Sequence, residues 1–317
     1  MAHTSIIGVG GENLIDHVTQ DGTISALAGG SPFNVAMALG RQTAAVHYLT
    51  PISTDHWGNL LADTLHSSHV VLSGGRVDAP TTIARVTVTD GIPTYTFERD
   101  GTAERQVTPA SLAQAMPEGL AALHTGSLAL TDGADADAWE ATCDAAFRAG
   151  RLVSLDPNVR LSVITDPDQY RSRMFRMMAK TSLLKLSDED LEGLCPDQSL
   201  DQALQIVRSK TSAPLLVMTK GPDGAIAVFE DRQISIPAPP VPGLVDTVGA
   251  GDTFMATLLA GLDRISALSP DAVSKLSGSD IESLLHRAGM AAAINCSRAG
   301  CNPPTLKELD TALAHAD

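Results

Sequence analysis

The chain has 317 residues, of which 44% are hydrophobic and 19% are charged, which is enough for one large buried core or for a large domain with a small one. Its net charge of −15 and the absence of a long basic run in the sequence argue against nucleic-acid binding. Aromatic residues make up only 3%, which favours helices packed on a sheet over an all-β sandwich.

Other simple classes are also disfavoured. The four cysteines form no CxxC pair, and the His66–His69 pair has no third ligand nearby, so a structural zinc site is not expected. The N-terminal residues lack the basic and apolar regions of a signal peptide, and no apolar run reaches transmembrane length. We therefore expect a cytoplasmic protein without a membrane partner.

The N-terminal part predicts a strand at 5–9, a hairpin at 14–28 around an Asp-Gly turn, and a helix. Asn13 stands where a dinucleotide-binding glycine pattern needs glycine, so that motif is rejected. Ser31 is expected to cap the helix and Pro32 to be its first residue. A second hairpin is predicted at 81–99, and the two hairpins together indicate a small separate sheet.

From about residue 105, short apolar runs alternate with helical stretches, which predicts a parallel sheet with helices on both faces. The expected strands are 120–130, 151–158, 182–187, 214–221 and 225–230. The expected helices are 136–150 (closed by Gly150), 201–210, 254–262 and 281–298. Three strands end in polar residues, at 124–126, 156–158 and 219–221, and these ends predict the edge of a ligand site.

The stretch DTVGAGD at 246–252 directly precedes an apolar helical pattern. The helix is expected to begin near Gly251, so the first free amide groups come from 249–252 and, with the helix dipole, form an anion site. Asp252 would lie in the first helical turn, where the dipole favours its ionised form. It could then accept a proton from a hydroxyl group that attacks a phosphoryl group, while Asp246 anchors the substrate. The alternative is a helix-capping aspartate after a tight glycine turn.

DTVGAGD resembles the C-terminal signature of the ribokinase/PfkB family of carbohydrate kinases, and GGSPFNVAMALGR at 29–41 resembles its N-terminal glycine-pair motif. The resemblance covers essentially the whole chain. It implies a single ribokinase-like domain over 1–317, with a three-layer α/β/α body, a mostly parallel sheet and a small β-sheet lid. The lid would be formed by about 12–30 and 80–103.

The resemblance also implies roles for residues that match the motifs. Asp252 would be the catalytic base, and Gly249, Ala250 and Gly251 would form the anion hole. The acceptor sugar would be bound by Asp16, Gly29, Gly30, Asn34, Arg99, Arg160 and Asp246. ATP would be bound by Thr219, Lys220, Gly221 and Gly224 of TKGPDGA, and by Lys185 and Asn295. An ordinary β-turn remains the alternative for TKGPDGA, and a surface ion pair remains the alternative for Arg160.

The segments GENLID, FERDGTAER, DPNVR and NCSRAGCNPP are most similar to the fructokinase branch, which implies D-fructose as the acceptor. Glu98 departs from that branch, where an aromatic residue is common. Two alternatives stay open: a kinase of another acceptor, such as 2-keto-3-deoxygluconate or a nucleoside, and a non-catalytic sugar-binding protein.

The family uses Mg²⁺, placed through water by an N-x-x-E motif that is replaced here by the segment Ser187–Asp190. Asp190 keeps the carboxylate, so the resemblance implies a water-mediated metal contact there. Cys301 stands where the family commonly has a small residue near its monovalent-cation loop, which leaves K⁺ dependence open. Lid edges pair in many relatives, which implies a homodimer.

Overall fold

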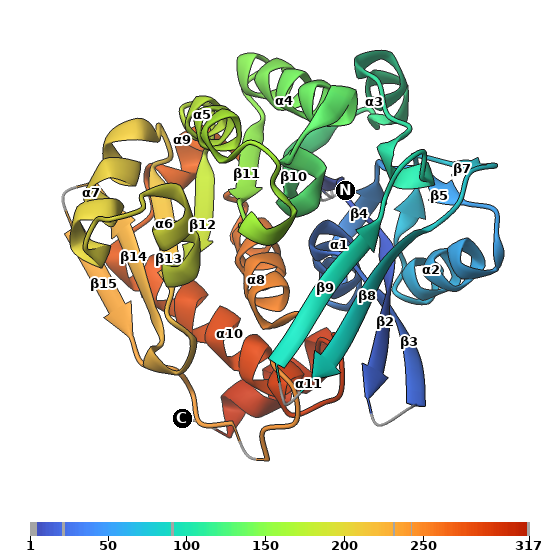
Figure 1. Ribbon diagram of the computed structural model, residues 1–317. Coiled ribbons are helices and arrows are strands. Elements are labelled where there is room, and N and C mark those ends of the chain that lie inside the picture. The colour runs from blue at the N-terminus through green and yellow to red at the C-terminus, as the bar shows by residue number, and fades with distance from the viewer. Residues whose placement is uncertain (1–4, 21–22, 90–91, 231, 242, 316–317) are drawn as a thin grey trace.

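The central sheet of the computed structural model contains seven parallel strands and two antiparallel strands at one edge, within the described residues 5–20, 23–89, 92–230, 232–241 and 243–315 (Figure 1). Its order is β15-β14-β13-β12-β11-β10-β1-β4-β6. The strands are β1 (Ile6–Val9), β4 (Ala45–Tyr48), β6 (Val71–Leu72), β10 (Leu120–Gly126), β11 (Leu152–Asp156), β12 (Leu183–Ser187), β13 (Leu215–Thr219), β14 (Ala225–Phe229) and β15 (Arg232–Ile236). Parallel pairing brings the carboxyl ends of the parallel strands to one edge of the sheet.

Helices cover both faces of this sheet, as predicted. One core contains side chains of α1 (Ser31–Arg41), α2 (His56–Ser67), α8 (Ala250–Arg264) and α10 (Gly278–Cys296). The other contains side chains of α3 (Pro109–Ala115), α4 (Gly133–Arg148), α5 (Pro167–Met178), α6 (Asp188–Leu194) and α7 (Leu200–Lys210). Alternate strand residues serve the two cores: Leu183 of β12 lies in the first and Leu184 in the second. The short α9 (Pro270–Val273) and α11 (Leu306–Ala314) complete the helices among the described residues.

The two predicted hairpins form one separate four-stranded sheet beside the body (Figure 1). Its strands are β2 (Leu14–Gln20), β3 (Thr23–Gly29), β8 (Thr82–Thr89) and β9 (Ile92–Glu98), in the order β3-β2-β8-β9. The hairpins join through parallel pairing of β2 with β8. Their predicted Asp-Gly turns, 21–22 and 90–91, lie outside the described residues. A two-stranded sheet, β5 (Ile52–Ser53) with β7 (Arg76–Val77), lies nearby.

The start of α1 differs from the prediction. Gly30, not Ser31, is the N-cap residue, and its φ of 108° suits only glycine. A Cβ atom at Gly30 would lie 2.5 Å from the carbonyl oxygen of Glu12, so the backbone passes too closely for a larger residue. The Ser31 hydroxyl group is therefore not used as a helix cap and bonds elsewhere. The predicted role of Gly150 is confirmed, because it follows the end of α4 with a φ of 72°.

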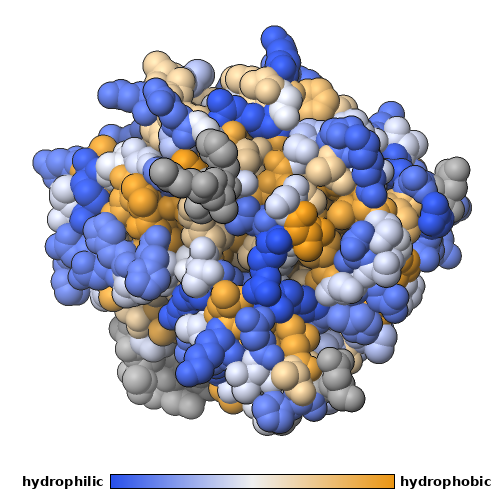
Figure 2. All heavy atoms as spheres, turned by 180° about the vertical axis from the view of Figure 1, so that it is seen from behind, coloured by the Kyte–Doolittle hydropathy of each residue, from blue (hydrophilic) through white to orange (hydrophobic). Residues whose placement is uncertain are grey.

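Hydrophilic residues cover most of the rim of the face shown in Figure 2, and hydrophobic residues form smaller areas between them. Within the described part of the chain, none of the helices combines the length and the apolar character needed to cross a bilayer.

Candidate active site

Two cavities meet at the loop that precedes α8. The first has a volume of about 910 Å³ and is lined by residues of the small sheet and of the body, including Asp16, Asn34, Arg160, Lys185 and Asp252. The second has a volume of about 610 Å³. Thr247, Ala250 and Gly251 line both cavities. A group bound in one cavity can therefore be passed to a molecule in the other at this loop.

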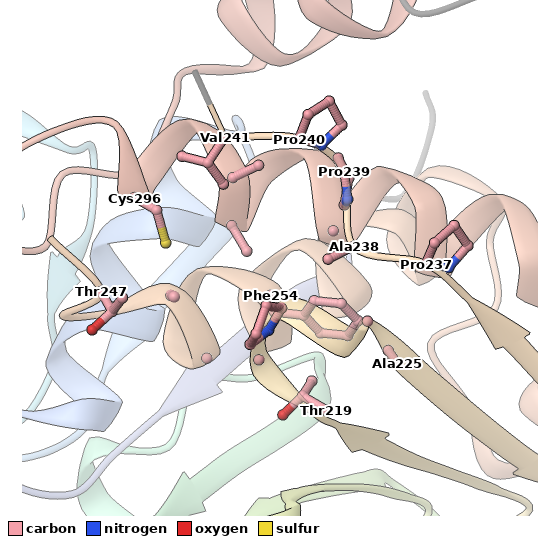
Figure 3. A pocket seen from close by; sticks show the side chains of 18 of the residues that line it. Thr219, Ala225, Pro237, Ala238, Pro239, Pro240, Val241, Thr247, Phe254 and Cys296 are labelled. Atoms are coloured by element: carbon pink, nitrogen blue, oxygen red, sulfur yellow. The ribbon is translucent and has the colours of Figure 1, made fainter. Parts of the chain in front are cut away.

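The second cavity is mostly apolar (Figure 3). Pro239, Val241 and Phe254 are among its lining side chains, and Thr219 and Thr247 are two of its few polar ones. Its volume lies within the range of small-molecule sites, roughly 300–1,000 Å³. Apolar walls suit a flat base such as adenine, and the shared loop lies where the phosphate chain of a nucleotide would end.

The loop and the start of α8 provide unpaired amide groups, but not from every residue of the predicted range: the amide group of Ala250 donates to the carbonyl oxygen of Thr247 at 3.2 Å. Gly249 is the N-cap residue with a φ of 74°, and a Cβ atom there would collide with Sγ of Cys301. The amide groups of Gly251 and Asp252 have no acceptor among the described residues. Together with the dipole of the 15-residue helix, these donors favour an anion such as a phosphoryl group.

Asp252 lies in the first turn of α8, buried beside these amides. Its Oδ1 accepts a hydrogen bond from Oγ of Ser31 (2.7 Å), and its Oδ2 accepts one from Nδ2 of Asn34 (2.8 Å). Burial raises the pKa of this carboxyl group, while both hydrogen bonds, Lys185 and Arg160 act in the opposite direction. The net effect differs from the expectation based on the helix dipole alone, because desolvation outweighs the favourable contacts. A raised pKa makes the carboxylate a better proton acceptor.

Asp16 approaches the same cavity from strand β2. Its Oδ2 occupies the space that a Cβ atom of Gly29 would need, so glycine at 29 permits its position. Burial, with a smaller effect of the charge on Asp252, raises the pKa of Asp16 to about 6. Gly29, Gly30 and Asn34 line this cavity too, so the structure brings together the predicted sugar-binding residues of the N-terminal motif.

Lys185 of β12 provides a buried positive charge under the loop. Its Nζ lies 2.8 Å from Oδ2 of Asp156, the last residue of β11. Asp156, Asp190 and Asp252 all raise the pKa of Lys185 against the effect of burial, so the ammonium group stays charged. A Cβ atom on Gly251 would lie 3.0 Å from this Nζ. The ammonium group is therefore adjacent to the unpaired amide groups of the loop.

Arg160 and Asp246 also line the first cavity. Arg160 is exposed, and its Nη1 donates to the carbonyl oxygen of Val159 (3.0 Å). The Asp246 oxygens accept from the amide groups of Val248 (3.0 Å) and Gly300 (2.9 Å). In this arrangement Asp246 ties the loop to the segment around Gly300.

Arg99, predicted to reach the acceptor, does not line this cavity. It is buried, with Nε 2.9 Å from Oε1 of Glu104 and Nη1 donating to Oγ1 of Thr131 (3.2 Å). The structure thus corrects the expected position of its side chain. The carboxylate of Glu104, six residues beyond the end of β9, holds the guanidinium group inside the body.

The predicted nucleotide residues are only partly brought together. Thr219, Gly221 and Gly224 line the second cavity, but Lys220 does not, and its amide group donates to the carbonyl oxygen of Gly224 (2.8 Å). The segment is therefore a tight turn whose glycines face the cavity. Lys185 lines the first cavity instead of the second.

Asn295 has a structural contact instead of lining either cavity. It is fully buried at the end of α10. Its Nδ2 donates to the carbonyl oxygen of Val248 (2.8 Å), and its Oδ1 accepts from the amide group of Asn302 (2.8 Å). Asn295 therefore joins the loop before α8 to the segment after α10.

Asp190, predicted to contact the metal, is used locally. Its Oδ2 accepts from the amide group of Ser187 (2.7 Å) as part of a capping box, and its Oδ1 accepts from that of Val159 (2.6 Å). The neighbouring Glu189 lines the first cavity. No cluster of three potential metal-binding side chains occurs among the described residues.

Three residues of the site were not selected from the sequence: Glu12, Ser31 (expected only as a cap) and Asp156. Each is buried and makes its key contact with a segment far away in the chain, such as the 221 residues that separate Ser31 from Asp252. For Asp156, the polar end of the strand at 156–158 indicates a position at the edge of a site. Nothing in the local sequence indicates that Lys185 is its partner.

Comparison with known proteins identifies similar chains over nearly the full length. Residues 11–308 match the model of the pfkB family carbohydrate kinase. The chain is 39% identical over 274 residues to a fructokinase of Rhizobium leguminosarum bv. trifolii, covering 84% of this chain and 82% of the relative. It is 31% identical over 277 residues to a fructokinase of Klebsiella pneumoniae, covering 84% and 89%.

Solved structures show the same fold. A fructokinase from Xylella fastidiosa with bound ATP superposes with a TM-score of 0.91 at 25% identity, over 99% of both chains. A fructokinase from Vibrio cholerae O395 with fructose, ADP and potassium gives a TM-score of 0.83 at 24% identity, over 98% of both chains, which supports the fold alone. The predicted three-layer body with a small separate sheet is thereby confirmed.

Proposed function

The chain belongs to the pfkB family of carbohydrate kinases, and we propose that it transfers the γ-phosphoryl group of ATP to a primary hydroxyl group of D-fructose. One observation carries this proposal. The buried carboxylate of Asp252 and the unpaired amide groups of Gly251 and Asp252 lie where the two cavities meet. Phosphoryl transfer needs a proton acceptor and donors for the developing negative charge at one point.

The acceptor sugar occupies the first cavity. Asp16 and Asn34 offer it hydrogen-bonding groups, and Gly29 and Gly30 allow its close approach to the backbone. Asp246 contributes as well, because a carboxylate oxygen that accepts one amide group keeps a second lone pair for a sugar hydroxyl group. Arg160, exposed at the cavity, is a further contact for the acceptor.

ATP occupies the second cavity, with its adenine against the apolar wall and its phosphates toward Gly251. Thr219, Gly221 and Gly224 border this cavity, and their small size permits close contact with the nucleotide. The ammonium group of Lys185 lies next to the loop and stabilises negative charge on the transferred group. Lys220 and Asn295 support the surrounding backbone.

Mg²⁺ would supply positive charge that neutralises the phosphate oxygens. Of the two adjacent carboxylates, Glu189 lines the first cavity, whereas Asp190 is buried and does not line it. We therefore assign the water-mediated contact to Glu189 in place of Asp190.

The reaction follows from this geometry. The attacking hydroxyl group is held against Asp252, whose carboxylate accepts its proton as the bond to phosphorus forms. The amide groups and Lys185 stabilise the charge that develops on the phosphoryl oxygens. The small sheet closes over the first cavity as a lid, which keeps water from competing as the acceptor.

The charges around the first cavity favour a neutral sugar over an acid. Its lining carboxylates are Glu12, Asp16, Glu189, Asp246 and Asp252, and its lining cations are Arg160 and Lys185. Lys185 is already paired with Asp156, which leaves Arg160 as the only unpaired cation among the described lining residues. An acceptor such as 2-keto-3-deoxygluconate would bring a further negative charge into this surrounding. The fructokinase relatives support the same choice.

The test is ADP release from Mg-ATP with D-fructose, 2-keto-3-deoxygluconate, D-ribose and adenosine as acceptors. We expect the highest kcat/KM with D-fructose. A preference for the keto acid would mean that Arg160 binds the carboxylate of the acceptor, while the proposed phosphoryl transfer would remain. Binding of a sugar without ADP release would support the remaining alternative, a non-catalytic sugar-binding protein. Dependence on K⁺, pairing of two chains through their lids and a cytoplasmic location stay predictions.

A further inference from the structure

The hydroxyl group of Ser31 does not cap helix α1 but forms a hydrogen bond with Asp252. Oγ of Ser31 donates to Oδ1 of Asp252 at 2.7 Å, and Ser31 is only 7% exposed. Asn34, one turn further along α1, donates to the other oxygen at 2.8 Å. Each oxygen of the carboxylate therefore has its own donor, and both donors come from one helix.

The backbone of Ser31 is held by a second carboxylate. Oε1 of Glu12 accepts from the amide group of Ser31 at 2.9 Å, and Oε2 accepts from that of Ala129 at 3.3 Å. Glu12 is 1% exposed, and the Tyr48 hydroxyl group donates to its carbonyl oxygen at 3.1 Å. One side chain thus connects the segment after β1, the start of α1 and the segment after β10.

We propose that Glu12 and Ser31 are positioning residues for the base: Glu12 fixes the start of α1 through the Ser31 amide group, and the Ser31 hydroxyl group fixes the orientation of the Asp252 carboxylate. This inference rests on the proposed function, because it takes Asp252 as the base. Because Ser31 and Asn34 each donate to one oxygen, they fix the orientation of the Asp252 carboxylate. In that orientation a free lone pair faces the attacking hydroxyl group. A misplaced base loses rate steeply, by about 100-fold for an error near 1 Å.

Removal of the Ser31 hydroxyl group tests whether Ser31 orients the Asp252 carboxylate. In Ser31→Ala, we expect kcat with D-fructose to fall about 10- to 100-fold with little change in the KM for the sugar. The Asp252 carboxylate also loses a donor to its charged form, so the acid limb of the pH–rate profile moves to higher pH. Ser31→Thr keeps the hydroxyl group and should restore most of both properties.

A matched control removes a Ser–Asp hydrogen bond away from the site. Oγ of Ser277 donates to Oδ2 of Asp280 at 2.6 Å at the start of α10. Ser277→Ala should lower the melting temperature without any change in kcat or in the pH–rate profile. A purely structural role of Ser31 would make Ser31→Ala behave like this control.

Glu12→Ala and Glu12→Gln test whether Glu12 fixes the start of α1 through the Ser31 amide group. Alanine removes both acceptors, while glutamine keeps one acceptor oxygen, so we expect a larger loss of kcat in Glu12→Ala. The effects of Glu12→Ala and Ser31→Ala should not add in the double variant, because they act through the same contact. Additive effects, or a loss confined to the KM for D-fructose, would make Glu12 a direct sugar ligand and overturn its assignment.

A measurement without turnover separates this inference from the proposed function. The ¹³C signal of the Asp252 carboxyl carbon, identified by its absence in Asp252→Asn, reports its pKa directly. We expect titration at higher pH in Ser31→Ala than in the wild type, whichever sugar is the acceptor. No ADP release with D-fructose would then refute only the acceptor assignment, whereas identical titration and pH–rate profiles in the two proteins would refute the positioning role.

Discussion

The Nζ atom of Lys185 lies 2.8 Å from Oδ2 of Asp156, and both side chains are almost completely buried on the neighbouring strands β11 and β12. The pair lies on the face of the sheet that α8 covers, directly under Gly251. A buried ammonium group is costly unless it is paired, and the Asp156 carboxylate provides that partner. The same charge remains close enough to the loop to act on a bound phosphoryl group.

Lys185→Met should therefore lower kcat by about 100- to 1,000-fold, the usual effect of removing one donor to transition-state charge. D-fructose binding should be preserved, since this side chain is assigned to the phosphoryl group. Steady-state kinetics together with calorimetric titration of D-fructose would check both. Unchanged kinetics with ATP would show that the Lys185–Asp156 pair is only structural.

Asp156→Asn should move the alkaline limb of the pH–rate profile to lower pH. Asp156 is the largest influence that raises the pKa of Lys185, and without it burial favours the neutral amine. Asp190 and Asp252 also face Lys185 and keep part of the effect, while the buried His124 nearby stays neutral because burial lowers its pKa to about 3. If the alkaline limb of Asp156→Asn is identical to that of the wild type, Asp156 does not keep Lys185 charged.

Gly251→Ala tests the close approach at the loop. The new methyl group would lie 3.0 Å from Nζ of Lys185, which Asp156 holds in place, and it would narrow the space above the amide groups. We expect at least a 10-fold loss of kcat/KM for ATP with little change in stability. Gly278→Ala is the control, because it alters the first residue of α10 where the nearest atom to a Cβ is 3.6 Å away. Equal kinetics of the two variants would contradict the prediction.

Asp16→Asn should weaken D-fructose binding, with a rise of the KM by about 10- to 100-fold, because a charged acceptor of sugar hydroxyl groups is lost. Gly29→Ala should have a similar effect although Asp16 itself is kept, because the added Cβ atom would collide with Oδ2 of Asp16 and would displace the carboxylate. Fluorescence or calorimetric titration with D-fructose would measure both. A normal KM in Asp16→Asn would exclude Asp16 from the acceptor site.

The architecture could be predicted from the sequence because it depends on local patterns. Alternating residues in 81–99 define a hairpin, and apolar runs ended by polar residues define strands of a parallel sheet. Asp252 and the glycines before it can be located in the same way, since free amide groups at a helix start are a property of the local chain.

The partners of these groups could not be predicted, because they depend on the packing of distant segments. Asp156 and Lys185 have no sequence pattern that pairs them, and Ser31 was expected to be a helix cap because serine is common there. Arg99 was placed at the acceptor because its motif resembles that of relatives, although the nearby Glu104 holds it inside the body. Such side-chain contacts follow from the fold and cannot be read from spacing.

Glu12 makes stability dependent on pH in a defined direction. Burial raises its pKa from 4.5 to about 7, so the folded protein holds a proton between these values that the unfolded chain has released. Its contribution is therefore favourable below pH 4.5 and is lost as the pH rises to 7. Burial lowers the pKa of His124 from 6.5 to about 3, so His124 makes the folded protein more stable as the pH rises over part of the same range. The effect of Glu12 is therefore measured as a difference between the wild type and a variant that lacks its carboxyl group. The free energy of unfolding of the wild type minus that of Glu12→Gln should fall by about 2 kcal/mol from pH 5 to pH 8. A difference that does not change with pH would contradict this.

The central claim is that Asp252 is the proton acceptor in phosphoryl transfer. It is tested most directly by ADP release with Mg-ATP and D-fructose for the wild type and for Asp252→Asn, alongside D-fructose binding to both. Asparagine keeps the shape, and its single oxygen can still accept from the Asn34 amide group, but it cannot take the proton. We predict a kcat lower by about 100- to 10,000-fold with D-fructose binding retained. Turnover by Asp252→Asn at the wild-type rate would contradict the account.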